Sequence, residues 1–135
     1  MSSLDPVQPI GWAKPKGYAN GMLSPKGCRT LHVAGQIAWN ANQELVGRGD
    51  FAAQFRQALE NVVEVVRAAK GHPDEIASMT VYVTDKQAYL DALKDIGAAW
   101  RELLGKHYPA MALVQVADLL EDGAMVEIQA IAELR

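Results

Sequence analysis

Cysteine is almost absent from this chain, which has Cys28 alone among its 135 residues. One thiol cannot build a disulfide framework, so the fold must depend on a hydrophobic core. Positive charge is also scarce, because 13 Lys and Arg stand against 16 Asp and Glu, for a formal charge of -3. Without a run of Lys or Arg that would neutralise several phosphates, the sequence predicts no nucleic-acid partner.

Long apolar runs and targeting signals are missing as well. No stretch approaches the ~20 apolar residues of a membrane span, and the N-terminus lacks a basic segment followed by an apolar one. These absences predict a cytoplasmic protein with no membrane partner. The histidines His32, His72 and His107 lie 40 and 35 residues apart, without the close spacing typical of metal sites. We expect no metal and, because Gly47-Arg48-Gly49 lacks the Lys-Ser/Thr of a phosphate loop, no nucleotide or other cofactor.

What remains is an ordinary globular composition with 50% hydrophobic residues, enough to build one core. We expect a single domain over residues 1–135. Its first part, residues 1–16, should be an extended N-terminal segment, because proline and glycine interrupt any helical period between residues 5 and 27. Tyr18 lies in a possible first strand.

Hydrophobic periodicity predicts two helices and four strands. Apolar residues recur at helical spacing over residues 51–70 and again from Thr84 to Gly105. The predicted strands are residues 30–37, 79–83, 112–116 and 125–134. The order strand, helix, strand, helix, strand, strand predicts an α+β fold in which both helices pack on one face of a sheet.

Local signals mark the helix ends. Asp50 is a candidate cap for the first helix, and Gly71 can adopt a left-handed conformation after its last turn. Gln54 falls outside the apolar stripe of that helix in this interpretation. Thr84 and Gln87 have the spacing of a capping box at the start of the second helix. The apolar stripe predicted for the second helix is Tyr89, Leu93, Ile96, Trp100, Leu103 and Leu104.

Alternation assigns the strand residues to two faces of the sheet. The face toward the helices is predicted to contain Leu31, Val33, Ile37, Val81, Val83, Val114, Val116, Val126, Ile128 and Ala130. The opposite face is predicted to contain His32, Ala34, Gln36, Thr80, Tyr82, Leu113, Gln115, Met125, Glu127 and Gln129. This second face is half polar yet too apolar for full exposure, so we expect a homo-oligomer whose subunits bury it.

Glu127 is the residue of greatest chemical interest, because it interrupts an otherwise apolar strand on the face expected to be buried. Environments that bury a carboxylate also create general bases. Two alternatives stay open, a general base and an interface carboxylate that accepts backbone hydrogen bonds. The roles of His32, on the same face, and of His107, expected to be exposed after the second helix, also stay open. Cys28 has no base within reach along a regular strand.

Six segments, in the same order, resemble the RidA family of YjgF-like reactive imine and enamine deaminases. They are Gly17-Tyr18-Ala19-Asn20-Gly21, Val33-Ala34-Gly35-Gln36-Ile37, Gln57-Ala58-Leu59-Glu60-Asn61-Val62, Thr80-Val81-Tyr82-Val83-Thr84-Asp85, Tyr108-Pro109-Ala110 and Val126-Glu127-Ile128-Gln129-Ala130-Ile131-Ala132. The resemblance implies a chorismate mutase-like α+β fold in a trimeric barrel assembly. It also implies a homotrimer with a small-molecule ligand in each cleft between subunits.

The resemblance implies roles for individual residues. Glu127 matches the glutamate that helps deliver water to an imine carbon, Tyr18 matches the cleft tyrosine, and Gly35 matches the glycine whose backbone lines the cleft. In active members an arginine after Pro-Ala holds the substrate carboxylate, and the products are ammonia and a 2-oxo acid. In this sequence Met111 occupies the position of that arginine.

Two further positions depart from the family pattern in the same direction. Ala34 occupies the place of a serine, and Leu93 aligns with an asparagine. Each departure, like Met111, replaces a polar ligand-contacting group with an apolar one. Loss of a bidentate guanidinium clamp costs about 10²-fold to 10⁴-fold in binding a carboxylate-bearing imine. Efficient deamination of 2-imino acids is therefore not expected.

The sequence leaves two functions to compare. The first is a hydrolase that deaminates a less polar imine, enamine or related reactive metabolite, with water activated by Glu127, the substrate positioned by Tyr18 and Gly35, and an apolar wall of Met111, Ala34 and Leu93. The second is a non-catalytic small-molecule binding or holdase-like trimer that keeps the cleft without the chemistry. In that case Met111 acts as adaptable packing.

Overall fold

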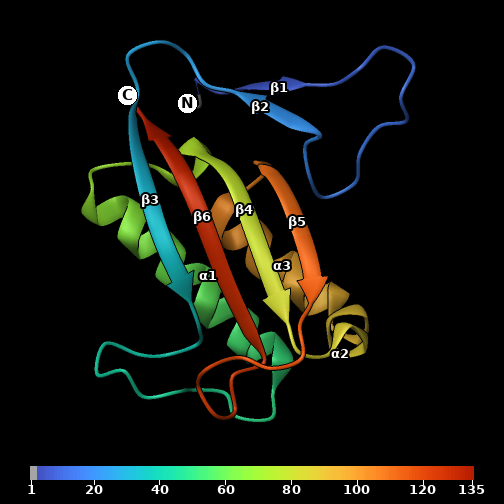
Figure 1. Cartoon of the computed structure of the whole chain (residues 1–135), viewed down its shortest axis with the longest axis vertical. Coiled ribbons are helices and arrows are strands. Elements are labelled where there is room, and N and C mark those ends of the chain that lie inside the picture. The colour runs from blue at the N-terminus through green and yellow to red at the C-terminus, as the bar shows by residue number, and fades with distance from the viewer. Residues whose placement is uncertain (1–2) are drawn as a thin grey trace.

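The computed structural model describes residues 3–135 and has a four-stranded mixed sheet at its centre (Figure 1). The strands are β3 (Arg29–Gln36), β4 (Ile76–Val83), β5 (Ala110–Gln115) and β6 (Val126–Leu134). Their spatial order is β3-β6-β4-β5, with β6 antiparallel to both of its neighbours and β5 parallel to β4. A parallel pair needs a crossover connection, which the helices between β4 and β5 provide.

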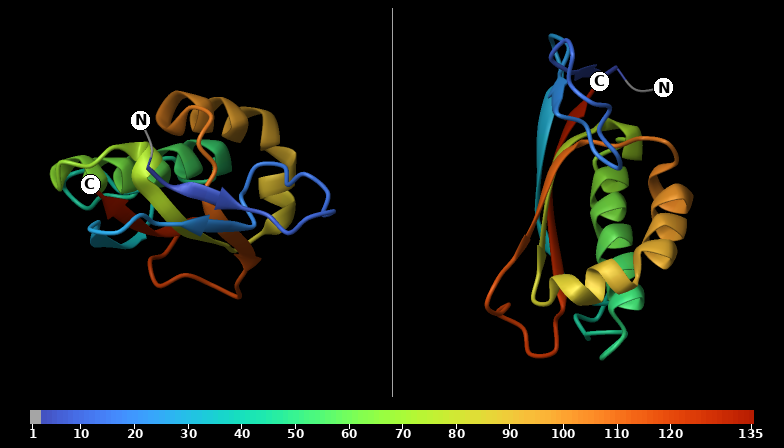
Figure 2. Two further views of the ribbon diagram at one scale, coloured as in Figure 1. Left: turned by 90° about the horizontal axis from the view of Figure 1, so that it is seen from above. Right: turned by 90° about the vertical axis from the view of Figure 1, so that its right-hand side faces the viewer.

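Three α-helices, α1 (Phe51–Ala68), α2 (Lys86–Asp91) and α3 (Leu93–Leu104), accompany the short 3-10 helix η1 (Pro73–Glu75) in the described chain. Figure 2 shows the α-helices on one face of the sheet and no helix on the other. The α+β fold with helices on one face is therefore as the sequence predicts. None of the helices described is both long enough and apolar enough to cross a membrane.

The hydrophobic core lies between the helices and one face of the sheet. Val33, Val81 and Ile128 face it from three strands and are at most 2% exposed. Leu59 and Val62 of α1 are fully buried against them. The predicted faces of β4 and β6 are correct in these positions. Side chains alternate between the two faces of a strand, and only one of the two possible assignments buries the β-branched residues.

The structure corrects the predicted faces of β5. Leu113 pairs with the buried Val81 and packs against the core, whereas Val114 pairs with Tyr82 and is 41% exposed. Every residue from Ala110 to Val114 is apolar, so alternation within the strand cannot choose its phase. Pairing with β4 decides which side chains enter the core.

The ends of α1 agree with prediction at one terminus and differ at the other. The backbone N–H of Ala53 donates to Oδ1 of Asp50 at 3.1 Å, so Asp50 is the predicted cap. At the other end Lys70, not Gly71, has the left-handed conformation, with φ 68°. Gly71 meets a different need, since a Cβ there would lie 2.5 Å from Cδ2 of Leu134.

The second predicted helix is in fact two helices, which meet at Ala92. The predicted capping box is wrong: Asp85 caps α2, and its Oδ1 accepts from the backbone N–H of Gln87 at 2.9 Å. The side chain of Gln87 donates instead to Asp91, at 2.8 Å. Because the chain changes direction at Ala92, Leu93 leaves the predicted stripe and is 49% exposed. One continuous period cannot reveal such a break.

The N-terminal segment forms a two-stranded ribbon beside the sheet. β1 (Asp5–Val7) pairs antiparallel with β2 (Gly21–Leu23), so the possible first strand at Tyr18 is wrong. Tyr18 lies in the loop between them. An isolated parallel bridge between Ala19 and Ala110 fixes the end of this loop against the start of β5.

Candidate functional site

Glu127 lies near the start of β6, opposite Tyr82 of β4, on the sheet face that carries no helix. Its side chain is half-buried and extends over Gly35 of β3. A Cβ at position 35 would lie 2.7 Å from Oε2 and 2.8 Å from Cδ of Glu127. Gly35 therefore provides the space that the carboxylate occupies. Within residues 3–135 the carboxylate forms no hydrogen bond or ion pair, which leaves both oxygens for water or a ligand.

A β-bulge brings Gly35 to this position. Val33 pairs with Ala130 and Gln36 pairs with Ile128. Two residues of β3, Ala34 and Gly35, therefore lie opposite the single residue Gln129 of β6. The extra residue turns Gln36 to the helix side, where it pairs with the buried Ile128, so its predicted place on the uncovered face is wrong. Asn61 of α1 holds the chain after the bulge, donating to the carbonyls of Ile37 and Trp39 at 3.0 and 2.8 Å.

Gln54 of α1 holds the segment of chain that precedes Glu127. It was predicted to lie outside the buried stripe of that helix. Its side chain is fully buried. Oε1 accepts from the backbone N–H of Met125 at 2.8 Å, and Nε2 donates to the carbonyls of Gly47 and Gly123 at 3.2 and 3.0 Å. The spacing three residues after Phe51 is the signal that could have identified it as a buried helical position.

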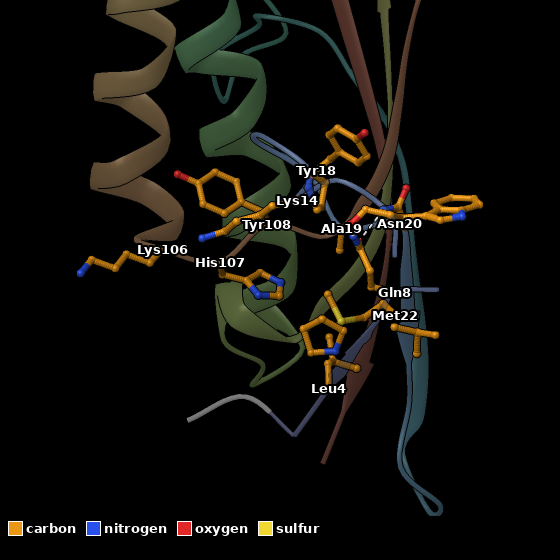
Figure 3. Close-up of a pocket in the computed structure, with 14 residues that line it drawn as sticks. Leu4, Gln8, Lys14, Tyr18, Ala19, Asn20, Met22, Lys106, His107 and Tyr108 are labelled. Atoms are coloured by element: carbon orange, nitrogen blue, oxygen red, sulfur yellow. Dashed lines mark hydrogen bonds between the residues drawn. The ribbon is translucent and has the colours of Figure 1, made fainter. Parts of the chain in front are cut away.

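Tyr18 lies far from this carboxylate along the sheet, at the start of β5. The backbone N–H of Ala19 donates to the carbonyl of Pro109 at 3.0 Å and brings the tyrosine beside Tyr108. Both rings line a cavity of about 530 Å³ between the N-terminal segment and the end of α3 (Figure 3). Tyr18 is 42% exposed, so part of this residue is accessible to a ligand.

The neighbouring His107, which was predicted to be exposed, is half-buried. Its Nε2 lies 2.7 Å from the carbonyl oxygen of Ile76, and its own carbonyl accepts from Nε1 of Trp100 at 3.0 Å. The Trp100 ring stacks on Tyr108, with centroids 5.9 Å apart and planes at 4°. These contacts hold the Tyr108 ring in place and use His107 as a structural link between α3 and β4.

Met111 and Leu93 line a second hollow of about 200 Å³, between β5 and the helices. Its other lining residues are Gly17, Phe55, Val81, Tyr89, Ile96, Gly97, Trp100, Tyr108 and Leu113. None of these side chains is charged. Burial raises the pKa of the Tyr89 hydroxyl group. The structure thus brings together two of the positions that the sequence analysis assigned to an apolar wall.

Within one chain, Glu127 and Met111 lie on opposite faces of the sheet. Met111 pairs with the buried Met79, which also pairs with Ala130, so Met111 belongs to the helix-covered face. Glu127 pairs with Tyr82 on the uncovered face. Met79 and Tyr82 are separated along β4 by roughly 10 Å. Glu127 and Gly35 therefore form one group of candidate residues and Met111 and Leu93 form another, and the hollow that contains the second group does not contain the first.

Other candidates lie apart from these groups. His32 is exposed on β3 and pairs with Ile131 on the uncovered face. Ala34 is exposed beside Gly35. Cys28 is a half-buried free thiol just before β3. In the described part of the chain, no three His, Cys, Asp or Glu side chains are grouped in a way that could hold a metal ion.

Residues 16–134 match the Ribonuc_L-PSP family, described as Endoribonuclease L-PSP. The chain belongs to this family. Its curated relatives include a RutC family protein of Sulfurisphaera tokodaii, 31% identical over 102 residues that span 76% of this chain and 78% of the relative. The human 2-iminobutanoate/2-iminopropanoate deaminase is 28% identical over 104 residues, covering 77% and 72%.

Solved structures of Ribonuc_L-PSP relatives share the fold. A Rid family protein of unknown function, YyfB from Yersinia pestis, superimposes with a TM-score of 0.86 at 33% identity, covering 97% of this chain and 98% of that one. The YjgF gene product of E. coli gives a TM-score of 0.66 at 32% identity, covering 94% and 91%. The mixed sheet and three helices of this Ribonuc_L-PSP protein thus match the RidA/YjgF fold.

Proposed function

We propose that this protein is a RidA-like hydrolase that deaminates an imine, enamine or related reactive small molecule, with water activated by Glu127. The observation that carries the proposal is the contact between Gly35 and Glu127, in which the missing side chain leaves room for a carboxylate without a protein partner. Family membership and a relative named 2-iminobutanoate/2-iminopropanoate deaminase support an imine deaminase-like role in general.

The cleft in this proposal lies between two subunits of a homotrimer, each a single domain over residues 1–135. Glu127 and Gly35 come from one subunit, and Tyr18, Met111 and Leu93 come from its neighbour. The placement of Glu127 and Met111 on opposite sheet faces supports this division, since the hollow that Met111 lines in one chain does not contain Glu127. The uncovered face, where Val114 is 41% exposed, supports burial against another subunit.

The chemistry follows from a carboxylate beside an imine carbon. Glu127 accepts a proton from water as the water oxygen bonds to the imine carbon. Glu127 passes that proton to the imine nitrogen, which gives a carbinolamine. Glu127 then takes the proton of the carbinolamine hydroxyl and delivers it to the nitrogen as the carbon–nitrogen bond breaks, so ammonia and a carbonyl product leave and Glu127 is again a carboxylate. Tyr18 positions the substrate by donating a hydrogen bond from its hydroxyl group, and the backbone of Gly35 lines the opposite wall.

Specificity is proposed to follow from the apolar wall. Met111 stands where the family arginine holds a carboxylate, and Leu93 lies beside it in a hollow without charged side chains. An uncompensated carboxylate is costly to place there. We therefore assign the protein to substrates that lack a carboxylate next to the imine carbon, and we expect slow turnover of 2-imino acids.

The test is ammonia release from freshly generated imines, one series with a carboxylate next to the imine carbon and one without. Glu127→Gln keeps the size of the side chain and removes the base, so turnover of the carboxylate-free series should fall about 10²-fold to 10⁴-fold. Glu133→Gln is the matched control, because Glu133 lies on the same strand and accepts a hydrogen bond from Thr30 at 2.9 Å. Full activity in Glu127→Gln would refute the proposed base.

The alternative is a small-molecule binding or holdase-like trimer without catalysis. The hollow lined by Met111 and Leu93 favours it specifically, because apolar walls bind a ligand without supplying any reacting group. In that case the wild type and Glu127→Gln should release no ammonia from either series, while both bind an apolar probe equally well. Product formation in proportion to enzyme concentration would exclude this alternative.

A further inference from the structure

Lysines around Tyr18 and Tyr108 form a feature that the proposed hydrolysis does not use, although Tyr18 itself has a role in that hydrolysis. Lys14 and Lys106 line the cavity of about 530 Å³ together with Trp12 and both tyrosines (Figure 3), and we call this the lysine cavity. An adjoining hollow of about 570 Å³ shares the two lysines and the tyrosines and adds Lys16. The lysine cavity thus concentrates positive charge in a chain of net charge -3.

The charge of the lysine cavity is not balanced by the protein. No Asp or Glu is among the residues that line the cavity or the adjoining hollow. Within the described range 3–135, Lys14, Lys16 and Lys106 form no ion pair, whereas Arg56 pairs with Glu102 at 2.8 Å. A concave surface lined by one sign of charge raises the local concentration of the opposite ion. The cavity is therefore suited to an anion.

The walls of the lysine cavity are held by specific hydrogen bonds. Gln8 donates from Nε2 to the carbonyls of Trp12 and Ala13 at 3.1 and 2.8 Å. Asn20 donates from Nδ2 to Oε1 of Gln8 at 2.7 Å and closes the loop on itself. On the opposite wall Tyr108 is fixed by stacking on Trp100. The lysines thus extend from an ordered frame, which lowers the entropy lost on binding.

Exposed aromatic rings add an apolar surface beside the charge. Trp12 is 61% exposed, Tyr18 42% and Tyr108 36%, and all three line the cavity. Such rings favour a planar apolar group through stacking and area burial. Trp12 and Lys14 also precede residue 16, where the family match begins, so residues outside that match contribute both a ring and a charge.

We propose that the lysine cavity binds a small organic anion with an aromatic body, such as an aryl-substituted carboxylate, with Lys14 and Lys106 at the anion and Trp12 and Tyr108 at the ring. Its volume lies within the range of about 300–1,000 Å³ that is typical of small-molecule sites. Nucleic acid is the less favoured occupant, because three lysines neutralise few phosphates and no basic stripe continues from the cavity.

The test is isothermal titration of the full-length protein with three probes. They are 3-phenylpropionate, its neutral amide 3-phenylpropionamide, and butyrate, which keeps the charge and lacks the ring. We expect 3-phenylpropionate to bind most tightly and to weaken several-fold when salt is raised from about 20 to 500 mM. In Lys14→Gln/Lys106→Gln its affinity should fall about 5-fold to 10-fold, while the amide is unaffected.

Matched variants separate the site from nonspecific charge. Lys26→Gln/Lys86→Gln removes the same charge from exposed positions outside both hollows and should leave the affinity unchanged. Trp12→Ala should weaken the anion and the amide by the same factor. Three results would overturn the proposal. The first two are an equal loss of affinity for 3-phenylpropionate in Lys26→Gln/Lys86→Gln and an affinity for the amide equal to that for the anion. The third is lysine-dependent binding of a single-stranded oligoribonucleotide that is tighter than binding of any of the three probes.

The proposal concerns binding alone and does not rest on hydrolysis. Repeating the titrations in Glu127→Gln keeps the two apart, because that side chain does not line the lysine cavity. Lysine-dependent binding without ammonia release would retain the anion site and reject the hydrolase. Ammonia release without lysine-dependent binding would do the reverse.

Discussion

Replacing Gly35 with alanine tests the contact on which the proposed function depends. The new Cβ would lie 2.7 Å from Oε2 of Glu127, against the 3.4 Å at which ordinary contact begins. The carboxylate must therefore move by roughly 0.7 Å, and a displacement of that order costs up to about 10²-fold in rate. Gly35 has no left-handed backbone, so strain of that kind does not contribute.

Stability should respond to the same clash. Overpacking costs about 1–3 kcal/mol, and the low end applies because the Glu127 side chain is flexible and half-buried. The measurement is urea unfolding of Gly35→Ala, Glu127→Ala and the double variant. Once Glu127 is truncated the added methyl has room, so Gly35→Ala should then be neutral or stabilising by about 0.4–1 kcal/mol. An equal loss in both backgrounds would show that the clash is not the cause.

Three further predictions concern other contacts. Gln54→Leu leaves the backbone groups of Gly123 and Met125 without their buried partner and should destabilise by about 3–5 kcal/mol in urea unfolding, with a loss below 1 kcal/mol contradicting this role. Met111→Arg should lower the KM for a carboxylate-bearing imine by at least about 10-fold, and an unchanged KM would count against the proposed specificity. Arg56 holds the pKa of Glu102 below its ordinary 4.5 by a hydrogen bond and by its charge. The free energy of unfolding of the wild type should therefore exceed that of Glu102→Gln by a constant amount above about pH 5, and this difference should vanish as the pH falls further. A difference that grows in acid would contradict the lowered pKa.

Much of the fold follows from periodicity, and its failures have physical causes. The strands that contribute Val33, Val81 and Ile128 alternate clearly, so their existence and the faces of these three residues could be predicted. In β5 every residue up to Val114 is apolar, and only pairing with β4 determines its phase. The break at Ala92 lies inside a continuous apolar period, which therefore predicts one helix where the chain forms two.

The candidate site was predictable one residue at a time, though not as an arrangement. A carboxylate in an apolar strand identifies Glu127, and family resemblance identifies Gly35. The bulge that joins them depends on register between β3 and β6, which the sequence does not state. The spacing of Gln54 from Phe51 could indicate a buried helical position, but its three hydrogen-bond partners could not be predicted, because they lie in loops that only the fold brings together.

Complementation between two inactive variants tests the proposed shared cleft most directly. Glu127→Gln and Tyr18→Ala are unfolded together in equal amounts, refolded and assayed for ammonia release from a carboxylate-free imine. If each cleft takes Glu127 from one subunit and Tyr18 from its neighbour, about one quarter of the clefts regain both groups, and activity should return to about that fraction of wild type. If the two residues act within one chain, no cleft regains both, and the mixture should stay as inactive as its components.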